Sequence, residues 1–471
     1  MRSHGLLRLP VALESAAGVL IGALLVLAWY GTGSLLVRFV ARLGPPEADR
    51  PHPHTALAIA RACAYGAGLW SLAWLGLGLA GAYTTPAAAV ALIAGLVLAA
   101  LAVHRSRREH AGAMMAISRR MGARGPEKAG KGGVTTGDGA GSSGRGPTSA
   151  AALALVAAAL AAGLLAALAP PTAKDTLQYH AALPKAFVAA EALVVVGDNI
   201  ASYFPLAVQM QGVWAMLLGR SVSARVGEAA FSAVTFAYFP LLLAAVYGWA
   251  RERGLDRAWA ATAPALVATV PAAWEVASGA YVDLALALYV ALAVRSAARW
   301  WATREPVYLA GVALAGGFAL GVKLLAVVPV LVTGVIVLIA ARRAGPAIAV
   351  AALAAPAAAV AIGSPWYLRT WALAGSPVFP FLVDVRPGQA PGWDAARSVM
   401  LGGLDDFHGG SPRSPADYLL APIRLSLLGQ REVPAFDEGV LGVAFLAGAG
   451  AIGWALRRRL LDREAGVAAA A

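Results

Sequence analysis

The chain has 471 residues, of which 59% are hydrophobic and 13% charged, and its mean hydropathy is +0.68. Soluble domains carry about 25% charged residues, so a water-soluble globular protein is excluded, because too few polar side chains remain to cover its surface. The net charge of +13 sits in short clusters beside apolar runs, which favours orientation in a membrane over nucleic-acid binding. The single cysteine, Cys63, excludes an internal disulfide.

Apolar runs of about 17 to 25 residues recur along the chain, and this length crosses the hydrocarbon core of a bilayer. They predict an all-α polytopic membrane protein with about eleven transmembrane helices. No small-residue cleavage site follows the first run, which indicates an uncleaved span. The expected spans are 13–33, 64–83, 86–103, 150–169, 224–249, 258–274, 279–297, 306–322, 324–341, 346–364 and 438–456.

Lys and Arg collect in alternate loops, and retained cytoplasmic loops are rich in these residues. The clusters that follow the first, third, fifth, seventh, ninth and eleventh spans therefore all belong on the cytoplasmic side. This threading places the amino terminus outside, which leaves the orientation of the first span the least constrained. The clusters are Arg38, Arg42, Arg50 and Arg61; Arg105 to Arg145; Arg251, Arg253 and Arg257; Arg299 and Arg304; Arg342 and Arg343; and Arg457, Arg458 and Arg459.

The predicted organisation has four parts. Amino-terminal helices at residues 1–103 precede a basic cytoplasmic linker at 104–149, whose Gly, Ser and Lys content from residue 122 onward predicts disorder. A transmembrane module at 150–456 and a cytoplasmic tail at 457–471 follow. The apolar stretch 205–219 is short, and we expect it to be re-entrant or interfacial, because a full crossing would invert every later basic cluster.

Two outward-facing loops, 170–204 and 365–437, carry polar residues, so chemistry is expected there. If the first loop is helical around residue 175, Asp175 and Tyr179 share one face, with His180 beside them. Such a carboxylate can accept the proton of an attacking hydroxyl, and nearby cations can hold a lipid phosphate as it leaves. The alternative is that Asp175 and its neighbours are solvated loop charges.

A series of motifs between residues 150 and 440 stands in a fixed order. The motifs are D-x-x-x-Y-H and L-P-K (Asp175 to Lys185), D-N-x-x-S-x-F-P (Asp198 to Pro205), A-Y-V-D-L-A-L (Ala280 to Leu286), G-x-x-L-G-x-K (Gly317 to Lys323), P-W-Y-L-R (Pro365 to Arg369) and G-S-P-V-F-P-F (Gly375 to Phe381). In this order, and on the predicted outer side, they resemble the C-type (GT-C) glycosyltransferase superfamily. The resemblance is to a bacterial branch akin to the protein mannosyltransferase and aminoarabinose transferase families.

The resemblance implies a bacterial inner-membrane enzyme that transfers a sugar from a polyprenyl-phosphate donor to a lipid, glycan or protein acceptor on the periplasmic or extracellular side. It carries the role of catalytic base to Asp175. Family members often have two acids in this loop, whereas Lys174 stands beside Asp175 here, so participation of a divalent metal ion stays open. Direct attack with inversion is expected, because no second nucleophile accompanies Asp175.

Ionisable residues inside or at the end of a span are costly and are therefore candidates for function. We expect the carrier phosphate to be held by some of the cationic candidates, while polar residues of the first loop contact the sugar or order the loop. Glu275 and Asp283 bind the sugar or a metal, or pair with cations, and Glu14 is expected to have no chemical role. The substrate-binding candidates are Tyr179, His180, Lys185, Asn199, Ser202, Tyr203, Glu275, Asp283, Lys323, Trp366 and Arg369.

Structural explanations stand beside these functional ones. Lys323 could snorkel to lipid headgroups, and Arg369 with Trp366 could anchor an aromatic belt. The rival function is a transporter or lipid flippase, which predicts charge pairs in mid-span and internal symmetry; a noncatalytic assembly partner is a third. No internal repeat is found and the charges gather at one interface, which favours an enzyme. Asp405, Asp406 and His408 form a short cluster without a complete set of metal ligands.

Overall fold

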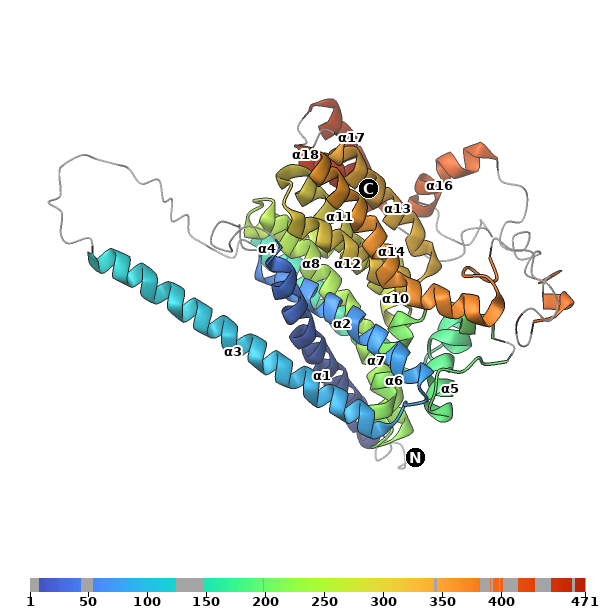
Figure 1. Cartoon of the computed structure of the whole chain (residues 1–471). Helices are drawn as coiled ribbons and strands as arrows, with labels where there is room; N and C mark the ends of the chain where they lie inside the picture. The colour runs from blue at the N-terminus through green and yellow to red at the C-terminus, as the bar shows by residue number, and fades with distance from the viewer. Residues whose placement is uncertain are drawn as a thin grey trace, which may run out of the picture.

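The computed structural model describes most of the chain as a bundle of helices (Figure 1). The regular secondary structure of the described residues is helical, in agreement with the predicted class. The described residues are 8–43, 54–123, 147–197, 199–342, 345–381, 390, 393–397, 399–400, 414–427, 442–459 and 462–470.

Seven helical segments of the described chain are long and apolar enough to cross a membrane. An eighth candidate is bent: α9 (Arg257–Ala268) and α10 (Pro271–Ser278) meet at 66°. The break falls where Pro271 opens α10, because proline cannot donate the amide hydrogen that would continue α9. The seven are α1 (Arg8–Ala41), α2 (Thr55–Leu79), α3 (Thr85–Ala123), α4 (Pro147–Ala167), α7 with α8 (Ala224–Phe236, Tyr238–Glu252), η4 with α13 (Leu324–Ala326, Val327–Ala341) and α14 (Pro346–Ala374).

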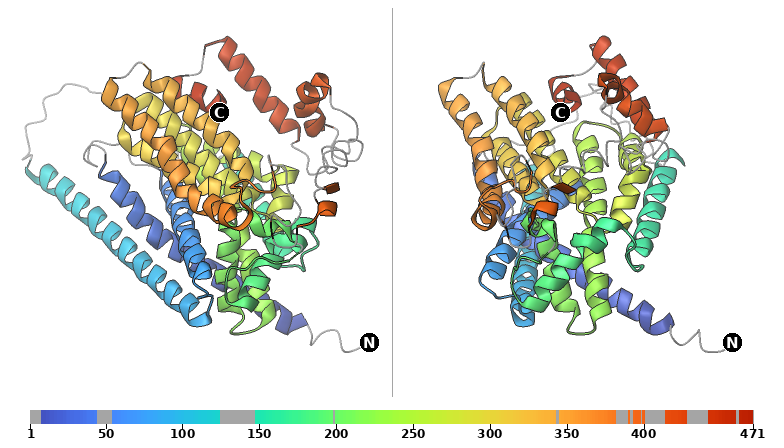
Figure 2. Two further views of the ribbon diagram at one scale, coloured as in Figure 1. Left: turned by 45° about the vertical axis from the view of Figure 1, so that its right-hand side comes forward. Right: turned by 90° about the vertical axis from the view of Figure 1, so that its right-hand side faces the viewer.

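The predicted count of eleven spans is not confirmed. Three further helices lie where the remaining spans were predicted: α11 (Asp283–Thr303), α12 (Pro306–Val322) and α17 (Val443–Arg457). At 17 and 15 residues, α12 and α17 are shorter than the roughly 20 residues of a typical span. The predicted linker is helical at its start, since α3 runs on to Ala123 and extends away from the bundle (Figures 1 and 2); residues 124–146 lie outside the described part.

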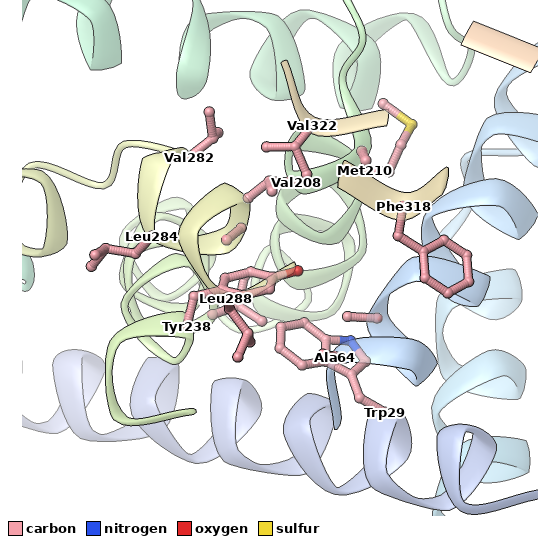
Figure 3. Packing of buried hydrophobic residues seen from close by; sticks show 14 of the residues in the cluster. Trp29, Ala64, Val208, Met210, Tyr238, Val282, Leu284, Leu288, Phe318 and Val322 are labelled. Carbon is pink, nitrogen blue, oxygen red and sulfur yellow. The ribbon is translucent and has the colours of Figure 1, made fainter. Parts of the chain in front are cut away.

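The core is a single large cluster to which most of the bundle helices contribute. Figure 3 shows its middle, where Trp29, Tyr238 and Phe318 come together from α1, α8 and α12. Helices α1 and α2 approach so closely that a methyl group on Gly66 would overlap the carbonyl oxygen of Trp29. Small residues at such crossings allow van der Waals contact between helix backbones, which drives packing where lipid is the solvent.

Helix α6 (Ala207–Gly219) occupies the stretch that was predicted to be re-entrant or interfacial. It has 13 residues, or about 20 Å at 1.5 Å per residue, and all but Leu218 are buried in the bundle. Its Gln211 accepts a hydrogen bond from the Trp29 indole and donates one to the Ala67 carbonyl, each at 2.9 Å. The segment is thus a short, enclosed helix that positions polar groups inside the protein.

Candidate active site

The first predicted loop forms a π-helical turn, η2 (Thr176–His180), followed by α5 (Ala182–Ala190). Asp175 immediately precedes η2, and the Tyr179 hydroxyl donates a hydrogen bond to Asp175 Oδ2 at 3.1 Å. The two side chains therefore lie on one face, as their spacing suggested. Both are partly exposed, so the carboxylate is held in place by the phenol and still open to a reactant.

Contacts with two other elements fix η2. The Thr176 hydroxyl donates a hydrogen bond to the Gly279 carbonyl in the turn between α10 and α11. The His180 ring lies 5.5 Å from the ring of Tyr281, which belongs to the same turn. On its other side, His180 Nδ1 is 2.8 Å from Nε2 of Gln209 in α6. The break between α9 and α10 thus brings their following turn against the segment that carries Asp175.

A second charged group stands at that turn. Lys323, which caps the carboxyl end of α12, places Nζ 3.0 Å from Oδ1 of Asp283, the first residue of α11. The two side chains are 37% and 34% exposed. An ion pair with this much access to solvent exchanges partners at little cost, since exposed pairs contribute about 1 kcal/mol or less.

The protonation states of η2 follow from its surroundings. Burial raises the pKa of the Tyr179 hydroxyl well above its usual value, and the negative charges of Asp175 and Asp283 raise it further, so the phenol stays a proton donor. Burial, with a smaller contribution from Lys323, lowers the pKa of His180 to about 3. The imidazole is therefore neutral at physiological pH, and Lys323 is a cation whose charge reaches η2.

Aromatic rings line one side of this group. The Tyr179 ring lies 4.0 Å from that of His180 and 6.2 Å from that of Phe204. Phe204 in turn lies 5.7 Å from Phe381, which is 41% exposed. The rings form a continuous apolar strip from the exposed Phe381 to the residue that holds Asp175.

The polar candidates of the first loop order the loop itself. Asn199 donates to the Gln178 carbonyl at 2.8 Å and accepts a hydrogen bond at the start of η3 (Ile200–Tyr203). Ser202 bonds both the amide and the carbonyl of Val196. These contacts hold the stretch before α6 in a compact turn against η2.

The end of α14 closes that turn from the other side. Arg369 is buried and donates from Nη1 to the Ser202 carbonyl at 2.7 Å, while the Thr370 hydroxyl donates to the Tyr203 carbonyl at 2.6 Å. Tyr203 and Trp366 are buried as well. In this structure Arg369 thus binds backbone, and it fixes the position of the loop that carries Asn199.

The remaining candidates make contacts elsewhere. Lys185 forms an ion pair with Glu228 of α7 at 2.7 Å, and both side chains are about half exposed. Glu275 is exposed on α10. Glu14 lies 3.7 Å from Arg225 and accepts a hydrogen bond from the Ser223 hydroxyl at the start of α7. The structure therefore places Asp175, Tyr179 and His180 at η2 within the electrostatic reach of Asp283 and Lys323, while Lys185 and Glu14 bind residues at α7.

Sequence reasoning missed several members of the site. Thr176 and Gln209 were not singled out, and Phe204 and Tyr281 lay within quoted motifs without a role. Gln209 had a signal, since two glutamines interrupt an otherwise apolar stretch in α6. The others are ordinary loop residues whose importance comes from which turns meet in the fold.

The donor set for a metal ion is incomplete in the described residues, where no three His, Cys, Asp or Glu side chains come together. Asp283, the second carboxylate of the site, is already paired with Lys323. We therefore derive no step through a metal. The predicted candidates that lie outside the described residues are Asp198, Asp405, Asp406 and His408.

The apolar helices define a polytopic, helical membrane-spanning protein with a cluster of ionisable side chains at one end of its bundle. No family model, curated protein or solved structure matches the chain. Any assignment of function therefore depends on the chemistry of that cluster.

Proposed function

We propose that this protein is a membrane glycosyltransferase, which moves a sugar from a polyprenyl-phosphate donor to an acceptor hydroxyl with Asp175 as general base. The observation that carries the proposal is that η2 holds the Asp175 carboxylate, bound by Tyr179, and also feels the charge of Lys323, an accessible cation paired with Asp283. A transfer of this kind needs both, because a proton must leave the acceptor while negative charge builds on the leaving phosphate.

In the proposed step, the acceptor oxygen forms a bond to the anomeric carbon as the bond from that carbon to the phosphate oxygen breaks. The electron pair leaves with the phosphate, and the acceptor proton passes to Asp175. Tyr179 stays protonated and holds the carboxylate in place. Lys323 turns from Asp283 to the phosphate, and neutral His180 contributes hydrogen bonding without charge.

The charge distribution supports an outward-facing site. Arg253 and Arg299 lie near the carboxyl ends of α8 and α11, and α11 begins at the site with Asp283. Basic residues favour the cytoplasmic side of a membrane. As part of the proposal we retain α11, α12 and α17 as spans, which places Asp175 on the outer side of a bacterial inner membrane. The strip from Phe381 to Tyr179 offers an apolar surface to the polyprenyl chain or to the sugar.

The test compares cells that lack the gene with cells that express wild type, Asp175→Asn or Asp175→Glu, using mass spectrometry of envelope lipids and glycans. We expect one glycan or lipid species to depend on wild type. In membranes given that species' polyprenyl-phosphate donor, Asp175→Asn should lower turnover by about 100- to 10,000-fold, the usual range for a general base. An unchanged profile in well-expressing cells would rule out the transferase.

A transporter or flippase is distinguished in the same cells, because it moves its substrate unchanged. The ion pair between Arg295 and Glu252 is buried, but Glu252 is the last residue of α8, so this pair does not sit in mid-span. If Asp175→Asn keeps full substrate flux across the membrane while no glycan changes, transport replaces transfer as the function.

A further inference from the structure

Three arginines meet at the end of the bundle away from Asp175. Arg253 follows α8, while Arg295 and Arg299 lie on α11 with their guanidinium groups 5.9 and 5.5 Å from the Tyr308 ring centre. Arg299 is 16 residues after Asp283 on α11, about 24 Å away at 1.5 Å per residue. The arginine cluster is therefore separate from the Asp175 site, and a ligand bound there would not depend on glycosyl transfer.

The bundle itself supplies one carboxylate to these arginines. Glu252 binds Arg295 through both oxygens at 2.8 Å. The ion pairs of Arg253 and Arg299 come instead from residues 462–464: Asp462 contacts Arg253, and Glu464 lies 2.9 Å from Arg253 and 3.4 Å from Arg299. The Glu464 side chain is only 6% exposed, so a carboxylate from a distant segment is buried between two arginines.

This carboxylate leaves part of the arginine hydrogen-bonding capacity unused. Nε of Arg299 and Oε1 of Glu464 are both buried without a hydrogen-bond partner. A buried charge is tolerated only with good pairing, and a buried donor without a partner destabilises the fold. A phosphate group offers more acceptor oxygens than a carboxylate and matches the planar guanidinium fork equally well.

The segment that carries Glu464 is lightly held. Helix α18 (Arg463–Ala470) has eight residues, too few for a stable isolated helix, and packs on α11 with Val467 buried. Asp462 and Glu464 add ion pairs to Arg253 and Arg299. A competing anion can therefore replace this segment without disturbing the core.

We propose that Arg253 and Arg299 form a binding site for a phosphate group, which the carboxylate of Glu464 occupies in this structure. The phosphate comes either from an acidic phospholipid headgroup or from a soluble phosphate. Trp259, six residues after Arg253 and 67% exposed on α9, suits the headgroup region of a bilayer and favours the lipid.

The first experiment uses native mass spectrometry of the full chain in detergent with phosphatidylglycerol or phosphatidylcholine. Glu464→Gln should retain at least threefold more phosphatidylglycerol than wild type, with no change for phosphatidylcholine. Adding Arg253→Gln and Arg299→Gln should remove the gain. Glu191→Gln, which removes an exposed carboxylate paired with Arg220 at the other end of the bundle, serves as the control and should behave as wild type.

The second experiment uses the wild-type protein, so its result does not depend on whether the Glu464→Gln variant folds. Hydrogen exchange of residues 462–470 in the wild-type protein should rise when phosphatidylglycerol is added and stay constant with phosphatidylcholine. A rise with millimolar inorganic phosphate, but not with phosphatidylglycerol, would assign the site to a soluble phosphate. Unchanged exchange with both probes overturns the proposal.

Discussion

Lys323 Nζ lies 3.0 Å from Asp283 Oδ1, so the residue that caps the carboxyl end of α12 is bound to the residue that begins α11. The pair stands beside η2, where its positive member helps to keep His180 uncharged. Two helix ends that are 40 residues apart in the chain thus set the electrostatics of a third segment.

We expect Lys323→Met to separate stability from activity. The lost ion pair is partly exposed and should cost about 0.2–1 kcal/mol of unfolding free energy. Removal of the cation that faces the leaving phosphate should lower turnover by about 100-fold. Thermal denaturation and donor turnover measure the two effects, and Arg38→Gln, which breaks the exposed pair with Glu109, is the matched control. Equal losses of turnover in the two variants would contradict the role of Lys323.

The stability of the protein should depend on pH through His180. Its pKa is about 3 in the fold and near 6.5 when unfolded, so the unfolded chain binds the extra proton between these values. The contribution of neutral His180 to the free energy of unfolding is therefore complete above pH 6.5. It declines as pH falls, by up to about 1.4 kcal/mol per pH unit. In the His180→Gln variant the melting temperature should change less between pH 7.5 and 5.0 than it does in wild type. The His104→Gln variant, which alters an exposed histidine, should show the same pH dependence of the melting temperature as wild type.

Substitution of Arg369 should loosen the loop before α6. Arg369→Ala removes a charged donor from the Ser202 carbonyl and should cost about 1.5–3 kcal/mol, compared with about 1 kcal/mol for Thr370→Val at the Tyr203 carbonyl. Hydrogen exchange of residues 195–204 should rise in both variants and more in the first. Unchanged exchange in Arg369→Ala would show that the loop is fixed by other contacts.

Two glycines of α2 offer a matched test of the crossing with α1. Gly66→Ala should destabilise the protein by about 1–3 kcal/mol, because the new methyl group overlaps the Trp29 carbonyl. Gly76 has open space around its Cβ position, so Gly76→Ala should be neutral or slightly stabilising. Melting temperatures of the purified variants measure the difference, and a similar effect of both changes would contradict the close approach.

The sequence predicted the helical class because an apolar run that crosses a bilayer must satisfy its backbone hydrogen bonds internally, and a helix does so. It did not predict the break at Pro271 or the enclosure of α6, since both depend on which helices become neighbours. The sequence favoured α11 and α12 as two more spans. It did not predict that Asp283 at the start of α11 and Arg299 near its end would bind partners from other elements.

The site was predictable where its residues are neighbours in the chain. The spacing of Asp175 and Tyr179 indicated one shared face, and the hydrogen bond between them has that geometry. Their association with Asp283 and Lys323 comes from tertiary structure, as does the use of Lys185 in an ion pair with Glu228. Residue type alone did not distinguish the lysine at the site from the lysine at the surface.

The glutamines of α6 have a consequence for biogenesis. Gln211 finds its partners on α1 and α2, and Gln209 finds His180 on η2. A 13-residue segment with two amides is a poor substrate for insertion alone, since each amide in lipid must first leave water. The side-chain amides of α6 therefore find these hydrogen-bond partners only when α1, α2 and η2 are in place, so the burial of this segment depends on assembly of the amino-terminal half.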